Sequence, residues 1–469
     1  MNPLRPTPPK PFRSPQSPRS CWSPRPIAAL IALALGQSVA TIPALWAQPT
    51  PAPPQTGATL LVGAKAHLGT GDAIENAAIG FRNGTIDFVG RANEADRSKY
   101  TEVVDVTGSH VYPGFIAPNT TLGLQEIEAV RASVDAYEVG TFRPNVRSVI
   151  AYNTESEVIP TVRTNGVLLG QPTPRGGVIS GSSGVVHFDA WNWEDAAIRM
   201  VDGVHLHWPV VLHRHYDAGS LEVRRAKSYD QQRREIESFF REAAAYLQAH
   251  PRPVAEASAT PRDIRLEAMR GVFHGDAALY VHADDARALS EVVHFKRAFN
   301  LAQVVIVGGA ESHRVADMLR DNGISVMLQR VHSLPYHEDD DVDLPFKLPK
   351  LLQDEGVLFC LQNEGPHEFM GTRNLPFYAG TACAYGLTYE QAVRSVSLNA
   401  ARILGIDARY GSLEAGKSAT LFISTGDALD MRTNHVTHAF IDGRSIDLNN
   451  RQRELYRKYQ AKYNAPIQD

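Results

Sequence analysis

The stretch Val111–Leu124, VYPGFIAPNTTLGL, carries the strongest indication of the architecture of this chain. Its apolar frame Pro113-Gly114-Phe115-Ile116 is typical of a buried strand, and the polar residues Asn119 and Thr121 follow the frame directly. An amide oxygen and a hydroxyl are poor ligands for a transition metal. The strand is therefore expected to end in neutral polar groups, with no strong metal ligand among them.

On the N-terminal side of this stretch the sequence consists of short alternating strand-like runs, and the end of the chain has the same texture. Asn83-Gly84 and Asp442-Gly443 are turn signals between such runs. The runs are Leu60–Ala64, Ala77–Arg82, Ile86–Val89, Val103–Val106, Ala419–Ile423 and Ala439–Ile441. Two all-β pieces that flank a long centre predict one composite β-sandwich, formed by residues 58–112 and 409–447.

The centre, residues 113–408, alternates strand and helix signals. Strand-like Ala278–Ala283 and Val304–Val307 are each followed by a helical pattern. Two further strand-like runs, Ser325–Leu328 and Val357–Leu361, are followed by helical patterns at Ala379–Tyr385 and Tyr389–Leu398. Eight such units in roughly 290 residues fit a (β/α)8 TIM-like barrel, whose chemistry lies at the C-terminal strand ends. The apolar spacing of Tyr229–His250 predicts a helix that covers the barrel, and residues 448–469 are expected to form a helical tail.

Three further motifs strengthen this interpretation. Arg373–Pro376 is followed by Ala379-Gly380, Leu398–Gly405 reads LNAARILG, and Gly411–Lys417 reads GSLEAGK. Together with the opening stretch, they resemble the amidohydrolase superfamily, and within it the exported, imidazolonepropionase-like amidohydrolases. The resemblance covers roughly Thr59–Arg444 and implies the barrel, the composite sandwich and hydrolysis of C–N bonds at a divalent metal.

The resemblance also implies positions for the metal ligands, and most of them are altered here. In the family the first barrel strand ends in an H-x-H pair, whereas this chain has Asn119 and Thr121, and the preceding Asp is Ala117. The His expected after the fifth strand matches His282. The His expected after the sixth strand falls on Gly308. One divalent metal, either Zn, Fe or Mn, remains an option for this site, and no cofactor is firmly expected.

The family's general base is an Asp after the eighth strand, and that position falls on Asn363 or Glu364, depending on a one-residue shift. In an active enzyme Glu364 would serve as the base, His282 would orient substrate or hold one metal, and Asn119 would donate to an oxyanion. His187, His313 and Thr121 are the further candidates for substrate binding or recruitment to the site.

Two other segments invite a functional interpretation. His205-Leu206-His207 has the spacing that places both rings on one face of a strand, but its apolar neighbours favour an irregular segment with a structural or surface role. The Gly-rich Arg175–Gly184 offers many backbone N–H groups for an anion, and a lid or a plain loop is favoured over such a cradle.

Two hypotheses of different classes follow. In the first, the chain is an amidohydrolase-like hydrolase of small amides, cyclic amides or peptides with an impaired or absent metal site. In the second, it is a catalytically inactive barrel that binds a small ligand or a partner chain beside an active paralogue. Indifference to EDTA would favour the second. A homodimer is also possible, and no serine-nucleophile elbow stands out.

The first 47 residues are predicted to be a secretory signal peptide. They contain five basic and no acidic residues, then the apolar run Ile27–Ile42 and the small-residue site Ala44–Ala47. A Pro-rich linker, residues 48–57, follows. Removal of the signal changes the formal net charge from −4 to −9, which argues against nucleic acid as a partner. The protein is expected in the periplasm or secreted, without a stable membrane anchor.

The number of cysteines is compatible with a periplasmic or a secreted protein. Cys360 and Cys383 remain after processing, and two cysteines do not make a disulfide framework. Cys360 lies in an apolar run, so a buried thiol is the favoured interpretation.

Overall fold

The computed structural model describes residues 50–217, 220–253, 262–365 and 367–463. The predicted signal peptide lies outside these ranges. Within them, no helix is both long enough and apolar enough to cross a lipid bilayer.

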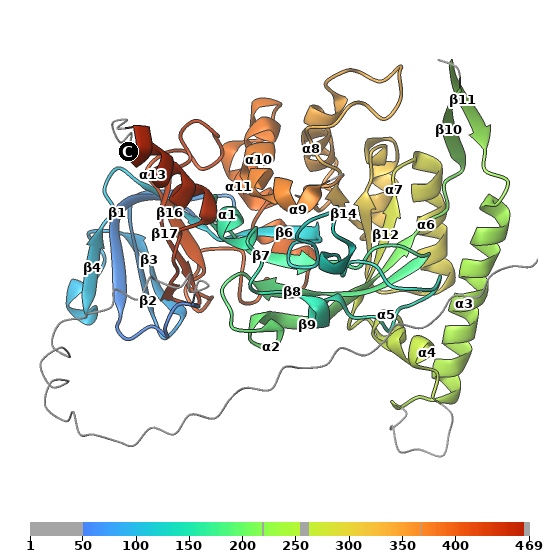
Figure 1. Ribbon diagram of the computed structural model, residues 1–469, viewed down its shortest axis with the longest axis horizontal. Coiled ribbons are helices and arrows are strands. Elements are labelled where there is room, and N and C mark those ends of the chain that lie inside the picture. The colour runs from blue at the N-terminus through green and yellow to red at the C-terminus, as the bar shows by residue number, and fades with distance from the viewer. Residues whose placement is uncertain (1–49, 218–219, 254–261, 366, 464–469) are drawn as a thin grey trace, which may run out of the picture. The chain divides into compact units, whose positions relative to one another are not determined.

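Strands from the two ends of the chain form one mixed sheet, which confirms the predicted two-ended β domain. Figure 1 shows the blue N-terminal strands beside the red C-terminal ones. β5 pairs in parallel with β1 and antiparallel with β16, so it joins the two halves. The strands are β1 Thr59–His67, β2 Ala73–Arg82, β3 Thr85–Arg91, β4 Glu102–Asp105, β5 His110–Pro113, β16 Leu421–Ser424, β17 Val436–Ile441 and β18 Arg444–Ser445.

The second sheet has eight strands and forms a nearly closed barrel, as predicted. Its order is β15-β14-β13-β12-β9-β8-β7-β6. The strands are β6 Phe115–Thr120, β7 Val167–Pro172, β8 Ile179–His187, β9 Ala197–His207, β12 Ala278–Ala283, β13 Val304–Gly308, β14 Ser325–Leu328 and β15 Phe359–Leu361.

In the described part of the chain no strand ladder joins β6 to β15, and the segment around the LNAARILG motif bridges the gap between them. The backbone N–H of Ile116 in β6 donates to the Val396 carbonyl at 2.9 Å. The side-chain amide of Asn399 donates to the Phe359 carbonyl in β15, also at 2.9 Å. This motif therefore closes the barrel and has an architectural role.

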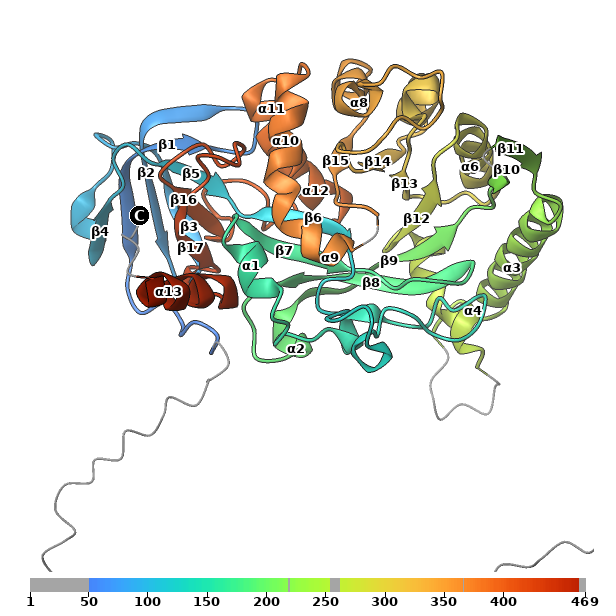
Figure 2. The same ribbon diagram turned by 45° about the horizontal axis from the view of Figure 1, so that its top comes forward.

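Helices lie along the outer side of strands β12 to β15, as Figure 2 shows for α6, α8 and α10. The expected covering helix is α3, whose Phe240 packs against Phe295 of α6 with ring centroids 4.8 Å apart. The helices are α1 Ile159–Arg163, α2 Trp193–Ala196, α3 Tyr229–Ala249, α4 Ile264–Ala268, α5 Arg270–His274, α6 Ala286–Ala298, α7 Ala316–Asp321, α8 Leu344–Asp354, α9 Glu368–Gly371, α10 Leu375–Ala384, α11 Tyr389–Ser395, α12 Leu398–Ile403 and α13 Arg451–Tyr463. A two-stranded hairpin, β10 Leu212–Asp217 and β11 Ser220–Arg225, precedes α3.

One barrel strand departs from the expected parallel β/α units. β8 is antiparallel to both β7 and β9, so the interpretation of Arg175–Gly184 as a lid or plain loop is wrong for its second half. Every residue of β8 is buried. A Cβ on Gly184 would lie 2.5 Å from the Arg199 carbonyl oxygen of β9, so glycine permits this close approach of the two strands.

A buried charge cluster around Asp189 links barrel loops to the mixed sheet. Asp189 Oδ1 accepts from the Arg163 guanidinium at 2.8 Å, and both side chains are about 95% buried. Asp189 Oδ2 accepts from Arg444 of β18 at 2.8 Å and from the backbone N–H of Ala52 at 3.0 Å. One carboxylate therefore holds α1, β18 and the N-terminal segment together.

The two cysteines among the described residues are free thiols. Cys360 is fully buried in β15, as expected, and burial raises its pKa. Cys383 is half-buried on α10.

Candidate functional site

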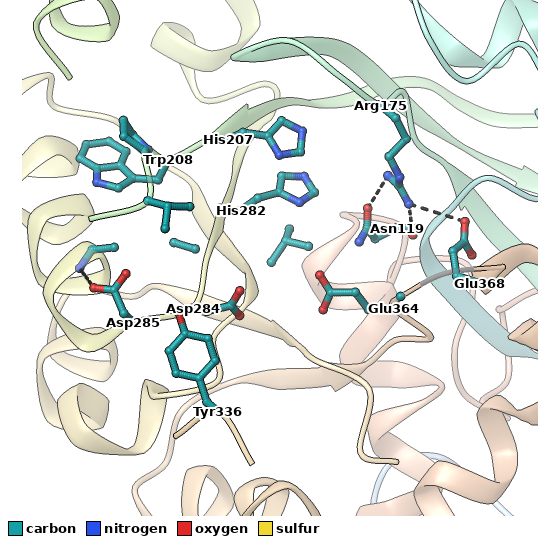
Figure 3. Close-up of a pocket in the computed structure, with 16 residues that line it drawn as sticks. Asn119, Arg175, His207, Trp208, His282, Asp284, Asp285, Tyr336, Glu364 and Glu368 are labelled. Atoms are coloured by element: carbon teal, nitrogen blue, oxygen red, sulfur yellow. Dashed lines mark hydrogen bonds and ion pairs between the residues drawn. The ribbon is translucent and has the colours of Figure 1, made fainter. Parts of the chain in front are cut away.

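A pocket of about 410 Å³ opens at the C-terminal ends of several barrel strands. Figure 3 shows histidines on one wall, Arg175 with Asn119 and Glu368 on another, and two carboxyl groups directed into the space between them. Its lining residues are Asn119, Arg175, His207, Trp208, Pro209, Val210, His282, Ala283, Asp284, Asp285, Ala288, Val307, Tyr336, Glu364, Gly365 and Glu368.

Asn119, at the end of β6, has all its polar groups engaged within the protein. Its backbone N–H donates to Gln171 Oε1 at 2.8 Å, and its Nδ2 donates to Gln362 Oε1 at 2.7 Å. Its φ of +49° is left-handed, a conformation that asparagine tolerates better than most residues. Gln362 accepts only one of the two Nδ2 hydrogens, so the predicted donation from Asn119 to an oxyanion would depend on the second one.

Arg175, in the loop between β7 and β8, lies at the C-terminal end of the first barrel strand, β6. Its guanidinium donates to Asn119 Oδ1 and to the Asn119 carbonyl, both at 2.8 Å. It also lies 3.6 Å from Glu368 Oε1, as the dashed lines of Figure 3 show. A fixed cation thus lies beside the position where the family resemblance would place the first two metal ligands.

Glu368, in the first turn of α9, accepts hydrogen bonds from the two threonines at the end of β6, Thr120 and Thr121. Thr121 Oγ1 donates to Glu368 Oε1 at 2.6 Å, the Thr121 backbone N–H donates to the same oxygen, and Thr120 Oγ1 donates to Oε2 at 2.9 Å. Burial raises the pKa of Glu368, whereas Arg175 and these donors lower it. Thr121 therefore binds Glu368, and it does not line the pocket.

His207 and His282 form the opposite wall. β9 runs in regular pairing through His207, which is aligned with His282 of β12, so the expectation of an irregular segment there is wrong. The two rings stack with centroids 4.1 Å apart. Burial lowers the pKa of His207 to about 4 and that of His282 well below its usual value, so both rings are neutral at physiological pH.

His205 lies behind this wall, inside the barrel. Its Nδ1 is 3.0 Å from His282 Nε2, and its Nε2 is 2.8 Å from Ser183 Oγ. Ser183 in turn donates to Asp202 at 2.6 Å. The histidine wall is thus tied to a fully buried carboxylate by a continuous hydrogen-bonded chain.

Two carboxyl groups, Glu364 and Asp284, project into the pocket. Burial, with a smaller contribution from Asp284, raises the pKa of Glu364 to about 7, and burial also raises the pKa of Asp284. Of the two positions considered for the eighth strand, Glu364 lines the pocket. Asn363 points elsewhere: its Oδ1 accepts from Tyr378 at 2.7 Å, and its Nδ2 donates to the Glu368 carbonyl.

The raised pKa of Glu364 predicts a pH-dependent stability difference. In the folded protein the pKa of Glu364 is about 7, above its ordinary value of 4.5, because burial favours the neutral acid. The neutral acid therefore contributes to the free energy of unfolding in full below about pH 4.5, and this contribution is lost as the pH rises through 7. The variant Glu364→Gln removes this loss. We expect it to gain up to about 3 kcal/mol over wild type near pH 8 and almost nothing near pH 4.5.

Urea unfolding at both pH values measures this difference. The matched control is Glu338→Gln, on an exposed side chain, which should track wild type at both pH values. A Glu364→Gln protein with the same pH profile as wild type would contradict the assignment.

Besides Thr121 and Asn363, two more of the sequence-predicted residues lie outside the pocket lining. β8 is antiparallel to its neighbours, so His187 at its end lies at the other side of the barrel, where Asp189 donates its backbone N–H to His187 Nδ1 at 3.4 Å. His313 lies half-buried in the turn Ser312–Val315, outside the pocket lining. The predicted residues that meet in the pocket are Asn119, His282 and Glu364.

Sequence reasoning missed four charged lining residues, Arg175, Asp284, Asp285 and Glu368, of which Arg175 and Asp284 had a sequence signal. Arg175 is the only charged residue in the Gly-rich stretch 175–184, and its position between two buried strands was the available signal. Asp284 directly follows the fifth barrel strand, two residues after His282, at the edge of the sheet where barrel chemistry is placed.

Comparisons with known proteins agree with this architecture. Residues 345–446 match the model of the amidohydrolase family. The crystal structure of an amidohydrolase from Thermotoga maritima MSB8 covers 83% of this chain and 99% of its own, with a TM-score of 0.71 and 22% identity. A Xaa-Pro dipeptidase crystallised with methionine in its active site covers 83% of this chain and 100% of its own, with a TM-score of 0.51 and 12% identity. The fold is that of the amidohydrolase superfamily.

The similarity to curated sequences is local. Imidazolonepropionase of Bacillus thuringiensis (strain Al Hakam) is 46% identical over 55 residues, and that of Bacillus mycoides (strain KBAB4) is 44% identical over 55 residues. These matches cover 12% of this chain and 13% of those enzymes. They establish a distant relationship over a short segment.

The donor groups in the pocket do not fit a divalent metal. Zinc and its relatives need three or four N, O or S ligands that converge on one point, and the described residues contain no group of three or more His, Cys, Asp or Glu side chains that could hold one. His282 Nε2 shares a hydrogen with His205 Nδ1, and the Arg175 guanidinium occupies the end of the first strand. A cation fixed there repels a second one.

Proposed function

We propose that this protein binds small amides, cyclic amides or peptides in the pocket at the C-terminal strand ends, and that it does so without the divalent metal typical of its superfamily. The observation that carries the proposal is the pairing of Arg175 with Asn119. Two hydrogen bonds of 2.8 Å lock the guanidinium against the strand end at which the metal-binding histidines of the family would lie. The fold supports a ligand site at this place, because barrels of this type carry their chemistry at the C-terminal strand ends.

Metal analysis tests this proposal directly. In the mature protein purified without chelator, we expect zinc, iron and manganese far below one atom per chain by inductively coupled plasma mass spectrometry. We also expect EDTA to leave the unfolding temperature unchanged, since no bound ion would contribute to stability. One tightly held metal per chain, or a clear loss of stability in EDTA, would refute the metal-free site.

A second candidate function is hydrolysis of a C–N bond without metal, and the pKa of Glu364 favours it. A buried carboxyl that titrates at about 7 is suited to act as a general base on water. Turnover of a small amide library that is lost in Glu364→Gln and unaffected by EDTA would establish this activity. Absence of turnover would leave a binding protein with the same pocket.

We further propose that the chain is exported to the periplasm or secreted and that it acts either as a homodimer or beside an active paralogue. The basic segment and apolar run before residue 48 support export. The mass of the protein recovered from periplasmic extract tests cleavage near Ala47, and light scattering on the purified protein tests its association state.

A further inference from the structure

We propose that the pocket selects a ligand that carries a cationic nitrogen, as an ammonium, amidinium or guanidinium group, held between Asp284 and Glu364. This inference rests on the proposed function, because it names the chemistry of the ligand for the same pocket. It follows from the acceptors that face the cavity, from the way His282 is oriented, and from the charge that remains after internal pairing.

The carboxyl groups of Asp284 and Glu364 are weakly satisfied by the protein. The Asp284 carboxyl accepts from the backbone N–H of Ala310 at 3.4 Å, and Glu364 accepts from Gln362 Nε2 at 3.5 Å. Both distances are at the long limit for a hydrogen bond, and among the described residues no basic side chain forms an ion pair with either carboxyl. Because a carboxylate has about four acceptor positions, most of the capacity of this pair is open to a ligand.

Glu368 provides the contrast within the same pocket. It accepts from Thr120 and Thr121 and lies 3.6 Å from Arg175. Its carboxylate has hydrogen-bond donors and a cation within the protein, as is usual for a buried charge. Among the described residues, Asp284 and Glu364 have no ion-paired basic side chain of this kind, and Arg175 and Arg330 act on Glu364 only from beyond ion-pair distance.

The hydrogen-bonded chain behind the wall adds a third acceptor. Asp202 accepts from Ser183 and Tyr280, each at 2.6 Å, so the only hydroxyl hydrogen of Ser183 is used. His205 Nε2 must then donate to Ser183 Oγ, which leaves His205 Nδ1 as an acceptor for the Nε2–H of His282.

In this tautomer the Nδ1 of His282 carries a lone pair, and no protein donor to it is found in the described part of the chain. His282 lines the pocket next to Asp284. Asp202 and His205 are positioning residues in this scheme, since they act on the ligand only through the ring of His282. The wall therefore presents acceptors and calls for a ligand rich in N–H donors.

The formal charge of the pocket agrees with this reading. The lining contains four acidic side chains and one basic side chain, Arg175, whose charge faces Glu368 and the oxygens of Asn119. Arg175, and to a smaller extent Arg330 from outside the lining, lower the pKa of Glu364, but neither forms an ion pair with it among the described contacts. A pocket with excess negative charge and low-dielectric walls attracts cations.

Two aromatic rings complete the fit. Trp208 and Tyr336 line the same cavity, and Trp208 Nε1 donates to Glu291 at 3.3 Å, which holds the indole in place. Aromatic faces stabilise organic cations. A volume of about 410 Å³ accommodates a ligand of one ring with a charged substituent.

Three probes of one shape and different charge test the proposal: benzamidinium, benzamide and benzoate. Isothermal titration calorimetry is performed on the mature protein at about pH 8 with EDTA present, where Glu364 is ionised. We expect benzamidinium to bind at least about tenfold more tightly than benzamide, with benzoate weakest.

The variants Glu364→Gln and Asp284→Asn should each weaken benzamidinium at least about tenfold while leaving benzamide nearly unchanged. Glu338→Gln, an exposed change of the same type, is the matched control and should bind all three probes as wild type does. If Asp284→Asn fails to fold, as judged by its thermal transition, Glu364→Gln alone carries the test.

The outcomes separate this inference from the proposed function. Equal binding of benzamidinium and benzamide, or tightest binding of benzoate, would overturn the cation preference and leave the small-ligand pocket intact. Failure of all three probes to bind at millimolar concentration would overturn both the inference and the assignment of this cavity as a ligand site.

Discussion

Replacing Asp189 with alanine is expected to destabilise the protein by about 3 to 5 kcal/mol, because a buried arginine would lose its partner. Arg163 is about 95% buried, and its charge is balanced by Asp189 Oδ1 at 2.8 Å. The same carboxylate accepts from Arg444 of β18 and from the N–H of Ala52. The substitution therefore leaves an unpaired charge and also releases the mixed sheet from the barrel loops.

Urea unfolding of wild type, Asp189→Ala, Arg163→Met and the double variant measures this effect. The double variant should be more stable than the sum of the two single losses, because methionine removes the unpaired charge. The control is Glu75→Ala in the exposed pair with Lys65, which should have little effect. A loss in Asp189→Ala no larger than that of the control would mean that the cluster does not stabilise the junction.

Replacing Arg175 with methionine is expected to cost about 3 kcal/mol or more, since it leaves Glu368 buried without a cation and removes two hydrogen bonds to Asn119. Methionine keeps much of the side-chain volume, so the loss reports mainly on charge and hydrogen bonding. Adding Glu368→Gln should restore part of the stability, because the neutral amide needs no cation.

Thermal and urea unfolding of the two single variants and the double variant measure the coupling between these residues. Arg432→Met, on a side chain that is 84% exposed, is the matched control and should have little effect. Additive losses in the double variant would show that Arg175 and Glu368 act independently, which would contradict the arrangement described for the pocket.

Most of the fold follows from local sequence pattern. Alternating apolar residues near the N-terminal end predicted strands, and the structure has β1 and β2 there. The pattern of Ala278–Ala298 predicted a strand and then a helix, and the structure has β12 and α6 there. Only the end of β8, at Gly184–Phe188, was predicted as strand, because the sequence ISGSSGVVH has small residues where a strand normally has large ones. These residues allow close strand contact, which only the three-dimensional neighbours reveal.

The site was predictable in part. His282 and Glu364 follow recognisable strands, so the sequence places them at the mouth of the barrel. The role of Arg175 depends on contacts with Asn119 and Glu368, which are 56 and 193 positions away, and no local pattern encodes such a meeting. His187 was expected in the pocket because β8 was expected to run parallel to its neighbours. The strand is antiparallel, so its end lies at the other side of the barrel.

The mixed sheet cannot be completed until the end of the chain has been synthesised. β5 needs β16 as its partner, with Pro113 opposite Leu421, and about 300 residues separate the two strands. At ribosomal rates of about 5–20 residues per second, the N-terminal strands wait roughly 15 to 60 seconds for that partner. Throughout this interval their open edge is a template for wrong pairing. The nascent chain is therefore a natural client for chaperones until its last strands emerge, and it cannot complete its fold early.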